Sequence, residues 1–216
     1  MHWFFSENRL KVVMPSAMHE CAGAWLSKMI TRASRRKLLS NDWEDTMDIM
    51  TGPEYRNFIG QHAGSFKQPD MAFVPIVGPD WIQCAAFPSV LESGWNESIA
   101  RREEDARLWQ EGSGNAVRVV LQAKVHEPDY RNCIHLVLSV TRAYPDGLGR
   151  LALPTHYANI FPIPPDYQKD PTISLDEFYA ENCSSTMNAK TEIPLNLSML
   201  RNVAAKYIRD RGYLPA

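Results

Sequence analysis

The sequence lacks the long apolar runs that membrane segments need. Nowhere do 18 apolar residues follow one another, and the apolar opening Met-His-Trp-Phe-Phe is interrupted at once by the polar residues 6–9. This opening is too short to be the apolar region of a secretory signal peptide. We therefore expect an intracellular protein, cytoplasmic or nuclear, that has no membrane partner.

Cysteine is also scarce. The four cysteines, Cys21, Cys84, Cys133 and Cys183, are far apart, form no Cys-x-x-Cys pair and have no histidine at zinc-finger spacing. This pattern argues against a structural zinc site and favours free thiols in a reducing compartment. Cys21 falls on an apolar helical face, where we expect it to pack in the core.

Neither sign of charge dominates the chain. Its 216 residues are 44% hydrophobic and 22% charged, with a net charge of −2 and no internal repeat or low-complexity segment. A chain of this length and composition can bury a full core as one domain, residues 1–216. Because the net charge gives no general attraction to nucleic acid, such binding would need a local basic patch.

The clearest helix begins after Ser16, which is a suitable N-cap. Apolar residues recur at every fourth position from Cys21 through Trp25 and Met29 to Ala33, which predicts a helix that packs on a sheet. It ends in a basic cluster formed by Arg32, Arg35, Arg36 and Lys37. The cluster is either a solvated helix end, where cations are favourable, or a phosphate-binding edge for nucleic acid.

Short apolar runs predict strands at residues 9–14, 69–75, 88–95, 117–125 and 133–141. A helix from Asn96 to Gln110, with Trp109 packing in the core, separates the third run from the fourth. This strand–helix–strand order predicts a parallel crossover. For residues 40–66, a short helix and a short strand both remain open.

The composition of the chain changes at Pro145, from where prolines become frequent. Prolines punctuate residues 145–171, which predicts a loop-rich arm with one short strand near Ile160. A short helix follows over residues 175–181, and residues 197–211 have the apolar periodicity of a terminal helix.

Two acids occupy corresponding places in successive strand-like runs. Asp70 lies at the start of the run 69–75, and Glu92 lies inside the run 88–95. If these strands are adjacent, the two carboxylates can meet at one end of a sheet and hold Mg²⁺, which needs only one or two carboxylates beside water and phosphate. The alternative for Asp70 is an ordinary Pro-Asp turn. Glu92 interrupts an apolar strand, and a buried carboxylate needs a partner or a metal.

Five short segments together point to a known family. They are residues 14–20 (Met-Pro-Ser-Ala-Met-His-Glu), 67–73 (Lys-Gln-Pro-Asp-Met-Ala-Phe), 88–94 (Pro-Ser-Val-Leu-Glu-Ser-Gly), 105–109 (Asp-Ala-Arg-Leu-Trp) and 112–114 (Gly-Ser-Gly). In this order and spacing, they resemble the fungal branch of the PD-(D/E)XK nuclease superfamily.

The resemblance covers about residues 10–140 and implies an α/β (α+β) fold. Its restriction-endonuclease-like αβββαβ core would have a mixed central sheet flanked by helices, over about residues 10–142. Residues 143–216 would then form the proline-rich C-terminal arm and the terminal helix.

The resemblance also implies an activity, the cleavage of DNA or RNA by a nuclease that depends on Mg²⁺ or Mn²⁺. Asp70 and Glu92 would bind the metal, and Glu20, on the first helix, would be the accessory acid. Many nucleases of this fold pair up to cut both strands, so a homodimer is a further expectation. The alternative is a catalytically inactive module of the same fold that binds nucleic acid or protein.

One position departs from the family pattern. The family places a lysine two residues after the strand acid, on the same side of the strand, and this sequence has Gly94 there. Replacement cations are Lys124 on the following strand and Arg101, Arg102 or Arg107 on the helix. Lys124 is the better candidate, because arginine stays protonated and cannot accept a proton. A third hypothesis is a structural role, in which Glu92 forms a buried ion pair with Arg107 or Lys124.

Overall fold

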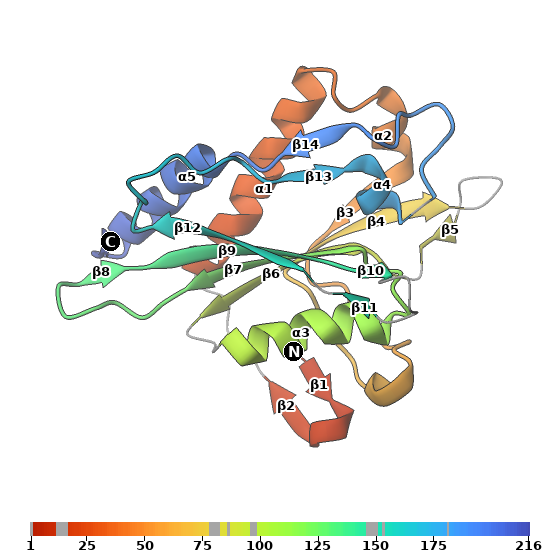
Figure 1. Cartoon of the computed structure of the whole chain (residues 1–216), viewed down its shortest axis with the longest axis horizontal. Helices are drawn as coiled ribbons and strands as arrows, with labels where there is room; N and C mark the ends of the chain where they lie inside the picture. The colour runs from red at the N-terminus through yellow and green to blue at the C-terminus, as the bar shows by residue number, and fades with distance from the viewer. Residues whose placement is uncertain are drawn as a thin grey trace.

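A mixed sheet forms the centre of the computed structural model, which describes residues 2–11, 17–77, 83–85, 87–95, 99–145, 151–152, 154–180 and 182–216 (Figure 1). Its strands, in spatial order, are β12 (Thr155–Phe161), β9 (Leu136–Arg142), β7 (Val119–Val125), β6 (Ser89–Trp95), β4 (Met71–Val77) and β3 (Met47–Met50). Strands β6 and β7 are parallel, as the crossover pattern predicts, and the other neighbours along this order are antiparallel.

The remaining elements surround this sheet. The helices are α1 (Ala17–Arg35), α2 (Asn41–Thr46), α3 (Ile99–Gly112), α4 (Leu175–Tyr179) and α5 (Leu197–Asp210), with two 3-10 turns, η1 (Phe5–Glu7) and η2 (Gly60–His62). The short strands are β1 (His2–Phe4), β2 (Arg9–Lys11), β5 (Gln83–Cys84), β8 (Cys133–Ile134), β10 (Tyr144–Pro145), β11 (Leu151–Ala152), β13 (Thr172–Ser174), β14 (Glu192–Pro194) and β15 (Leu214–Pro215).

The two faces of the sheet are covered by different parts of the chain. Helices α1 and α5, together with the antiparallel pair β13–β14, lie on one side, and α3 lies on the other beside the β1–β2 hairpin (Figure 1). We call these the α1 face and the α3 face. Alternate residues of the central strands divide between them, because successive side chains of a strand point to opposite faces.

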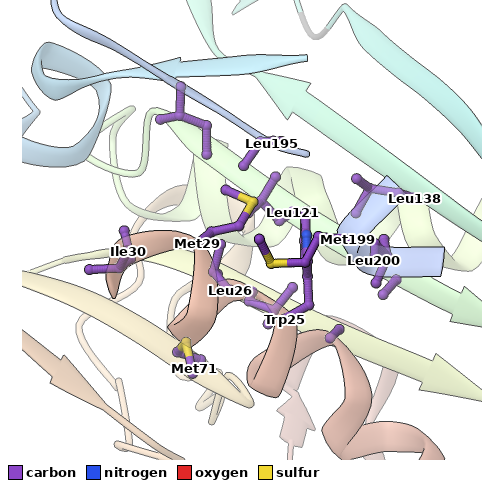
Figure 2. Close-up of a cluster of buried hydrophobic side chains, with 14 of the residues drawn as sticks. Trp25, Leu26, Met29, Ile30, Met71, Leu121, Leu138, Leu195, Met199 and Leu200 are labelled. Carbon is purple, nitrogen blue, oxygen red and sulfur yellow. The ribbon is translucent and has the colours of Figure 1, made fainter. Parts of the chain in front are cut away.

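The α1 face carries the larger apolar core. Leu121 and Leu138 of the sheet are buried together with Trp25 of α1 and Leu200 of α5 (Figure 2). Trp25 also donates from its indole nitrogen to the backbone oxygen of Asn196, at 3.0 Å. Burial of each such leucine contributes about 2 kcal/mol, so the α1 face supplies most of the apolar stabilisation.

The predicted helix and most predicted strands are confirmed. Cys21, Trp25, Met29 and Ala33 are buried along α1. Both alternatives for residues 40–66 occur, since α2 leads directly into β3. The expected N-cap Ser16, the first residues of the predicted helix 96–110, and part of the predicted strand 9–14 lie outside the described residues.

The predicted strand near Ile160 in the proline-rich arm is confirmed, and it is longer than expected. Residues Thr155–Phe161 form β12, a seven-residue edge strand of the main sheet that pairs with β9, so the core extends beyond residue 142. Pro154 and Pro162 flank this strand and leave its interior free to pair. Proline removes a ladder donor only where it stands inside a strand.

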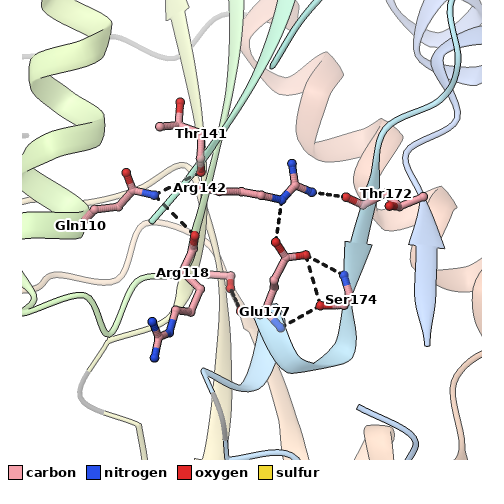
Figure 3. A network of polar contacts seen from close by, with 8 residues as sticks. Gln110, Arg118, Thr141, Arg142, Thr172, Ser174 and Glu177 are labelled. Carbon is pink, nitrogen blue, oxygen red and sulfur yellow. Dashed lines mark hydrogen bonds and ion pairs between the residues drawn. The ribbon is translucent and has the colours of Figure 1, made fainter. Parts of the chain in front are cut away.

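An ion pair ties the C-terminal arm to the sheet. Arg142 of β9 donates to a carboxylate oxygen of Glu177 at 2.6 Å and also to the backbone oxygen of Thr172 (Figure 3). Glu177 completes a capping box with Ser174 at the start of α4. One carboxylate therefore positions both the helix and the arm.

Replacing Arg142 tests this anchor. In Arg142→Met, the carboxylate of Glu177 and the oxygen of Thr172 lose a charged donor in a partly buried position, so the free energy of unfolding should fall by about 2 kcal/mol in urea titrations. Arg131→Met, which removes an exposed Arg–Asp pair, is the control and should change it by less than about 0.5 kcal/mol. Equal effects of the two substitutions would contradict the anchor.

Candidate functional site

The two acids predicted to meet lie at adjacent strands, with Asp70 directly before β4 and Glu92 inside β6. The antiparallel register of β4 and β6 pairs Met71 with Leu91, and its continuation by one residue sets Asp70 opposite Glu92. The Asp70 carboxylate also accepts a hydrogen bond from the backbone N–H of Ser93 on β6. Asp70 is exposed and Glu92 is buried, so the pair joins the surface to the interior.

Glu92 points to the α3 face and is held there by two donors. The indole nitrogen of Trp109, on α3, donates to Glu92 Oε1 at 2.7 Å. Lys67 Nζ lies 3.1 Å from the same oxygen and 3.1 Å from Asp105 Oδ1, also on α3. A single lysine therefore bridges a strand carboxylate and a helix carboxylate.

Lys67 reaches this place through a loop that is fixed by backbone hydrogen bonds. Its N–H donates to the oxygen of Tyr55, and its oxygen accepts from the N–H of Tyr55, both at 2.9 Å. The side chain is fully buried, with Nζ 5.6 Å from the Trp109 ring and 5.9 Å from the Phe4 ring. Aromatic faces attract a cation, so these rings add to the pull of the two carboxylates.

Burial and charge act in opposite directions on these groups. Burial raises the pKa of Glu92 to about 7, with smaller increases from the negative charges of Asp105 and Asp70, while the Lys67 ammonium lowers it. For Lys67, burial lowers the pKa, but the attraction of Asp105 and Glu92 outweighs burial and leaves the pKa raised. Lys67 therefore remains an ammonium at neutral pH.

Lys124 lies on β7, the strand next to Glu92, and is directly opposite Gly94, where the family pattern has a lysine. The parallel register pairs Glu92 with Gln122 and Gly94 with Lys124. The Gln122 side chain donates to the backbone oxygen of Arg102 on α3, at 2.9 Å, which places Gln122 on the α3 face. Lys124, two residues further along, is directed to that face too, and its side chain is buried.

The arginines of α3 are not the ion-pair partner of Glu92. Arg101 and Arg107 are exposed, and the buried Arg102 has its guanidinium 6.0 Å from the ring of Tyr157. The structural hypothesis was right that Glu92 has a buried cationic partner, but the partner is Lys67 rather than Arg107 or Lys124.

Glu20 is placed apart from this cluster. It is exposed in the first turn of α1, the helix that covers the opposite face of the sheet. In the described part of the chain, no three His, Cys, Asp or Glu side chains come together as a group able to hold a metal ion. Asp70 and Glu92 alone still offer two carboxylates on rigid strands, a donor set that suits Mg²⁺ or Mn²⁺. The accessory role of Glu20 stays a prediction.

The basic cluster of α1 also lies away from the acids. Arg32, Arg35, Arg36 and Lys37 are all exposed at the C-terminal end of α1, on the α1 face. The position suits the solvated helix end that the sequence left open, while contact with nucleic acid stays a prediction.

Sequence reasoning missed the bridging lysine and its second acid. Lys67 stands in the quoted segment 67–73, three residues before Asp70, but nothing in that segment indicates burial. Asp105 and Trp109 are four residues apart and share a face of α3, which was a usable signal. Trp109 was expected to pack in the core, and it does so while donating to Glu92.

Comparisons with protein-family models, with curated proteins and with solved structures find no match for this chain. The likeness to PD-(D/E)XK nucleases therefore depends on the quoted residues and on their arrangement. Among the described residues, no helix is long and apolar enough to cross a membrane.

Replacing Lys67 tests the bridge. Lys67→Met keeps the length of the side chain but leaves Glu92 and Asp105 buried without their shared cation, so stability should fall by about 3 kcal/mol or more in denaturant titrations. Lys28→Met, at an exposed position of α1, is the control and should be nearly neutral.

A compensated variant separates charge from packing. Adding Glu92→Gln and Asp105→Asn to Lys67→Met removes the unpaired charges, so it should recover a substantial part of the loss. If the triple variant is no more stable than Lys67→Met, the loss is one of packing and the charge bridge is refuted.

Proposed function

We propose that the chain is a divalent-metal-dependent nuclease with a restriction-endonuclease-like core, in which Asp70 and Glu92 bind the metal. The observation that carries the proposal is the register at position 94. Lys124 is the cross-strand partner of Gly94, so the chain has a lysine on the strand next to the one where the family has it. A lysine on the neighbouring strand, directly opposite position 94, points to the same face of the sheet and lies at the same height along the strands as the family's lysine would.

The order of elements supports the same proposal. Apart from the short elements α2, η2 and β5, the chain runs through α1, β3, β4, β6, α3 and β7, which matches the α, β, β, β, α, β order of the expected core. The first three of these strands are antiparallel neighbours, and α3 carries the chain across to the parallel β7. This arrangement puts both acids at the junction of β4 and β6.

Each residue of the site would have a separate role in the reaction. A bound Mg²⁺ or Mn²⁺ would supply Lewis acidity, which lowers the pKa of water and offsets phosphate charge. Asp70, exposed and hydrogen-bonded to the β6 backbone, presents a fixed carboxylate to solvent. Trp109 and Lys67 both hold Glu92 Oε1, which fixes the direction of its carboxylate. Lys124, on the neighbouring strand opposite Gly94, would supply the positive charge that offsets the charge developing during phosphoryl transfer.

One observation favours a second candidate, an inactive module of the same fold. Lys67 already gives Glu92 a cationic partner, and an internal ammonium can satisfy a carboxylate that would otherwise need a metal. In that case the cluster stabilises the fold, and the chain acts through binding alone.

Cleavage assays with matched variants test the proposal. With Mg²⁺ or Mn²⁺, the wild-type protein should cleave DNA or RNA oligonucleotides, and Asp70→Asn should lower the rate by about 100-fold or more because it removes an anionic ligand. Lys124→Met should cause a loss of similar order. Asp45→Asn, at an exposed position of α2, should leave the rate unchanged.

Calorimetric titration with Mn²⁺ separates the two candidates. The nuclease should bind Mn²⁺, and Asp70→Asn should abolish that binding. Absence of both cleavage and carboxylate-dependent Mn²⁺ binding in the wild-type protein would favour the inactive module. Cleavage that persists in Asp70→Asn would overturn the assigned site.

A further inference from the structure

A second group of side chains lies on the α3 face, beside Lys124 and farther from the acids. We call it the Tyr157 strip, formed by Arg102, Lys124, His126 and Tyr157. The registers of β7, β9 and β12 connect Gln122 with Ser139 and Ser139 with Tyr157, so Tyr157 shares a cross-strand row with Glu92. Helix α3 covers the middle of that row, where Gln122 and Ser139 are buried, and leaves its far end at β12 open.

Tyr157 presents an exposed aromatic ring that lies close to a buried arginine. Its side chain lies on the edge strand β12 and is 44% exposed, which is unusual for a large ring on a well-packed sheet. The guanidinium of the buried Arg102 lies 6.0 Å from the centre of the ring. A cation at this distance attracts the ring and restrains it. The ring is therefore organised before any ligand arrives.

Two buried cations, Arg102 and Lys124, lie on this part of the α3 face, and both are near His126. Burial lowers the pKa of His126, and the nearby Lys124, His135 and Arg102 lower it further, which places three cationic or titratable neighbours around one imidazole. The acids on adjoining segments are Asp129, 3.9 Å from His135, and the exposed Glu127, Glu103 and Glu104. Arg102 and Lys124 are buried in the strip itself and are fixed there.

We propose that the substrate is single-stranded nucleic acid, one base of which stacks on the exposed ring of Tyr157, at the open end of the row that also contains Glu92. The inference rests on the proposed nuclease function and names its substrate class. An exposed ring can stack an unpaired base, whereas the bases of a duplex are already stacked and paired. The cationic set is too small to follow the phosphates of a long duplex, which a broad basic surface would do.

Binding without cleavage provides the test. In EDTA, fluorescence anisotropy measures the affinity of the full chain for a labelled single-stranded oligonucleotide and for the duplex of the same sequence. The wild-type protein should prefer the single strand, and Tyr157→Ala should weaken that binding about tenfold. Tyr157→Phe should retain it, because stacking needs only the ring. Tyr167→Ala, at a 90% exposed position in the arm, is the matched control and should bind as the wild type does.

The outcomes separate this inference from the proposed function. Single-strand preference that is lost in Tyr157→Ala and kept in Tyr157→Phe supports the stacking site, even if the protein fails to cleave. Metal-dependent cleavage combined with equal or better binding of duplex, or with unchanged binding in Tyr157→Ala, refutes the stacking site and leaves the nuclease standing. Equal weakening in Tyr167→Ala also refutes it. Thermal unfolding of each variant verifies that the fold is intact.

Discussion

The Lys67 ammonium between Glu92 and Asp105 is the constraint on which the rest of the site depends. Two buried carboxylates on facing elements would repel each other and drive the strand and helix apart. One shared cation instead draws α3 onto β6, and Trp109 adds a neutral donor to the same carboxylate. Because the ammonium is fully buried, any change in one of these groups is felt by the others through a medium that screens charge poorly.

This constraint explains why the two faces of the sheet differ. The α1 face is filled mainly by apolar side chains, so its packing is set largely by shape, and the partly buried Arg142–Glu177 ion pair is compensated within itself. The α3 face mixes a small aromatic core with carboxylates, amides and cations, each of which must find a partner. Because apolar packing on the α1 face stabilises the sheet, the α3 face can carry polar and charged side chains. The acids and the Tyr157 strip both lie on that second face.

The sequence predicted elements better than it predicted partners. The four-residue spacing from Cys21 to Ala33 identified α1, and the order of runs around Trp95 identified the parallel pair, because both depend on local periodicity. The pairing of Asp70 with Glu92 followed once the strands were adjacent. Lys67 was missed because its loop has no periodic pattern and its partners lie far along the chain. The length of strand β12 was underestimated, because the prolines at its two ends are typical of loop structure.

Lys67 and Lys124 hold different positions relative to Glu92, and the difference bears on function. Lys67 contacts the carboxylate directly and is sealed from solvent, so it can neither accept a proton from water nor meet a substrate phosphate. Lys124 is level with Gly94 on the α3 face, where the buried Arg102 lies near the exposed ring of Tyr157. Of the two lysines, Lys124 is therefore the one whose register matches the position where the PD-(D/E)XK pattern has its lysine. Lys67 instead holds the carboxylate in place from the interior.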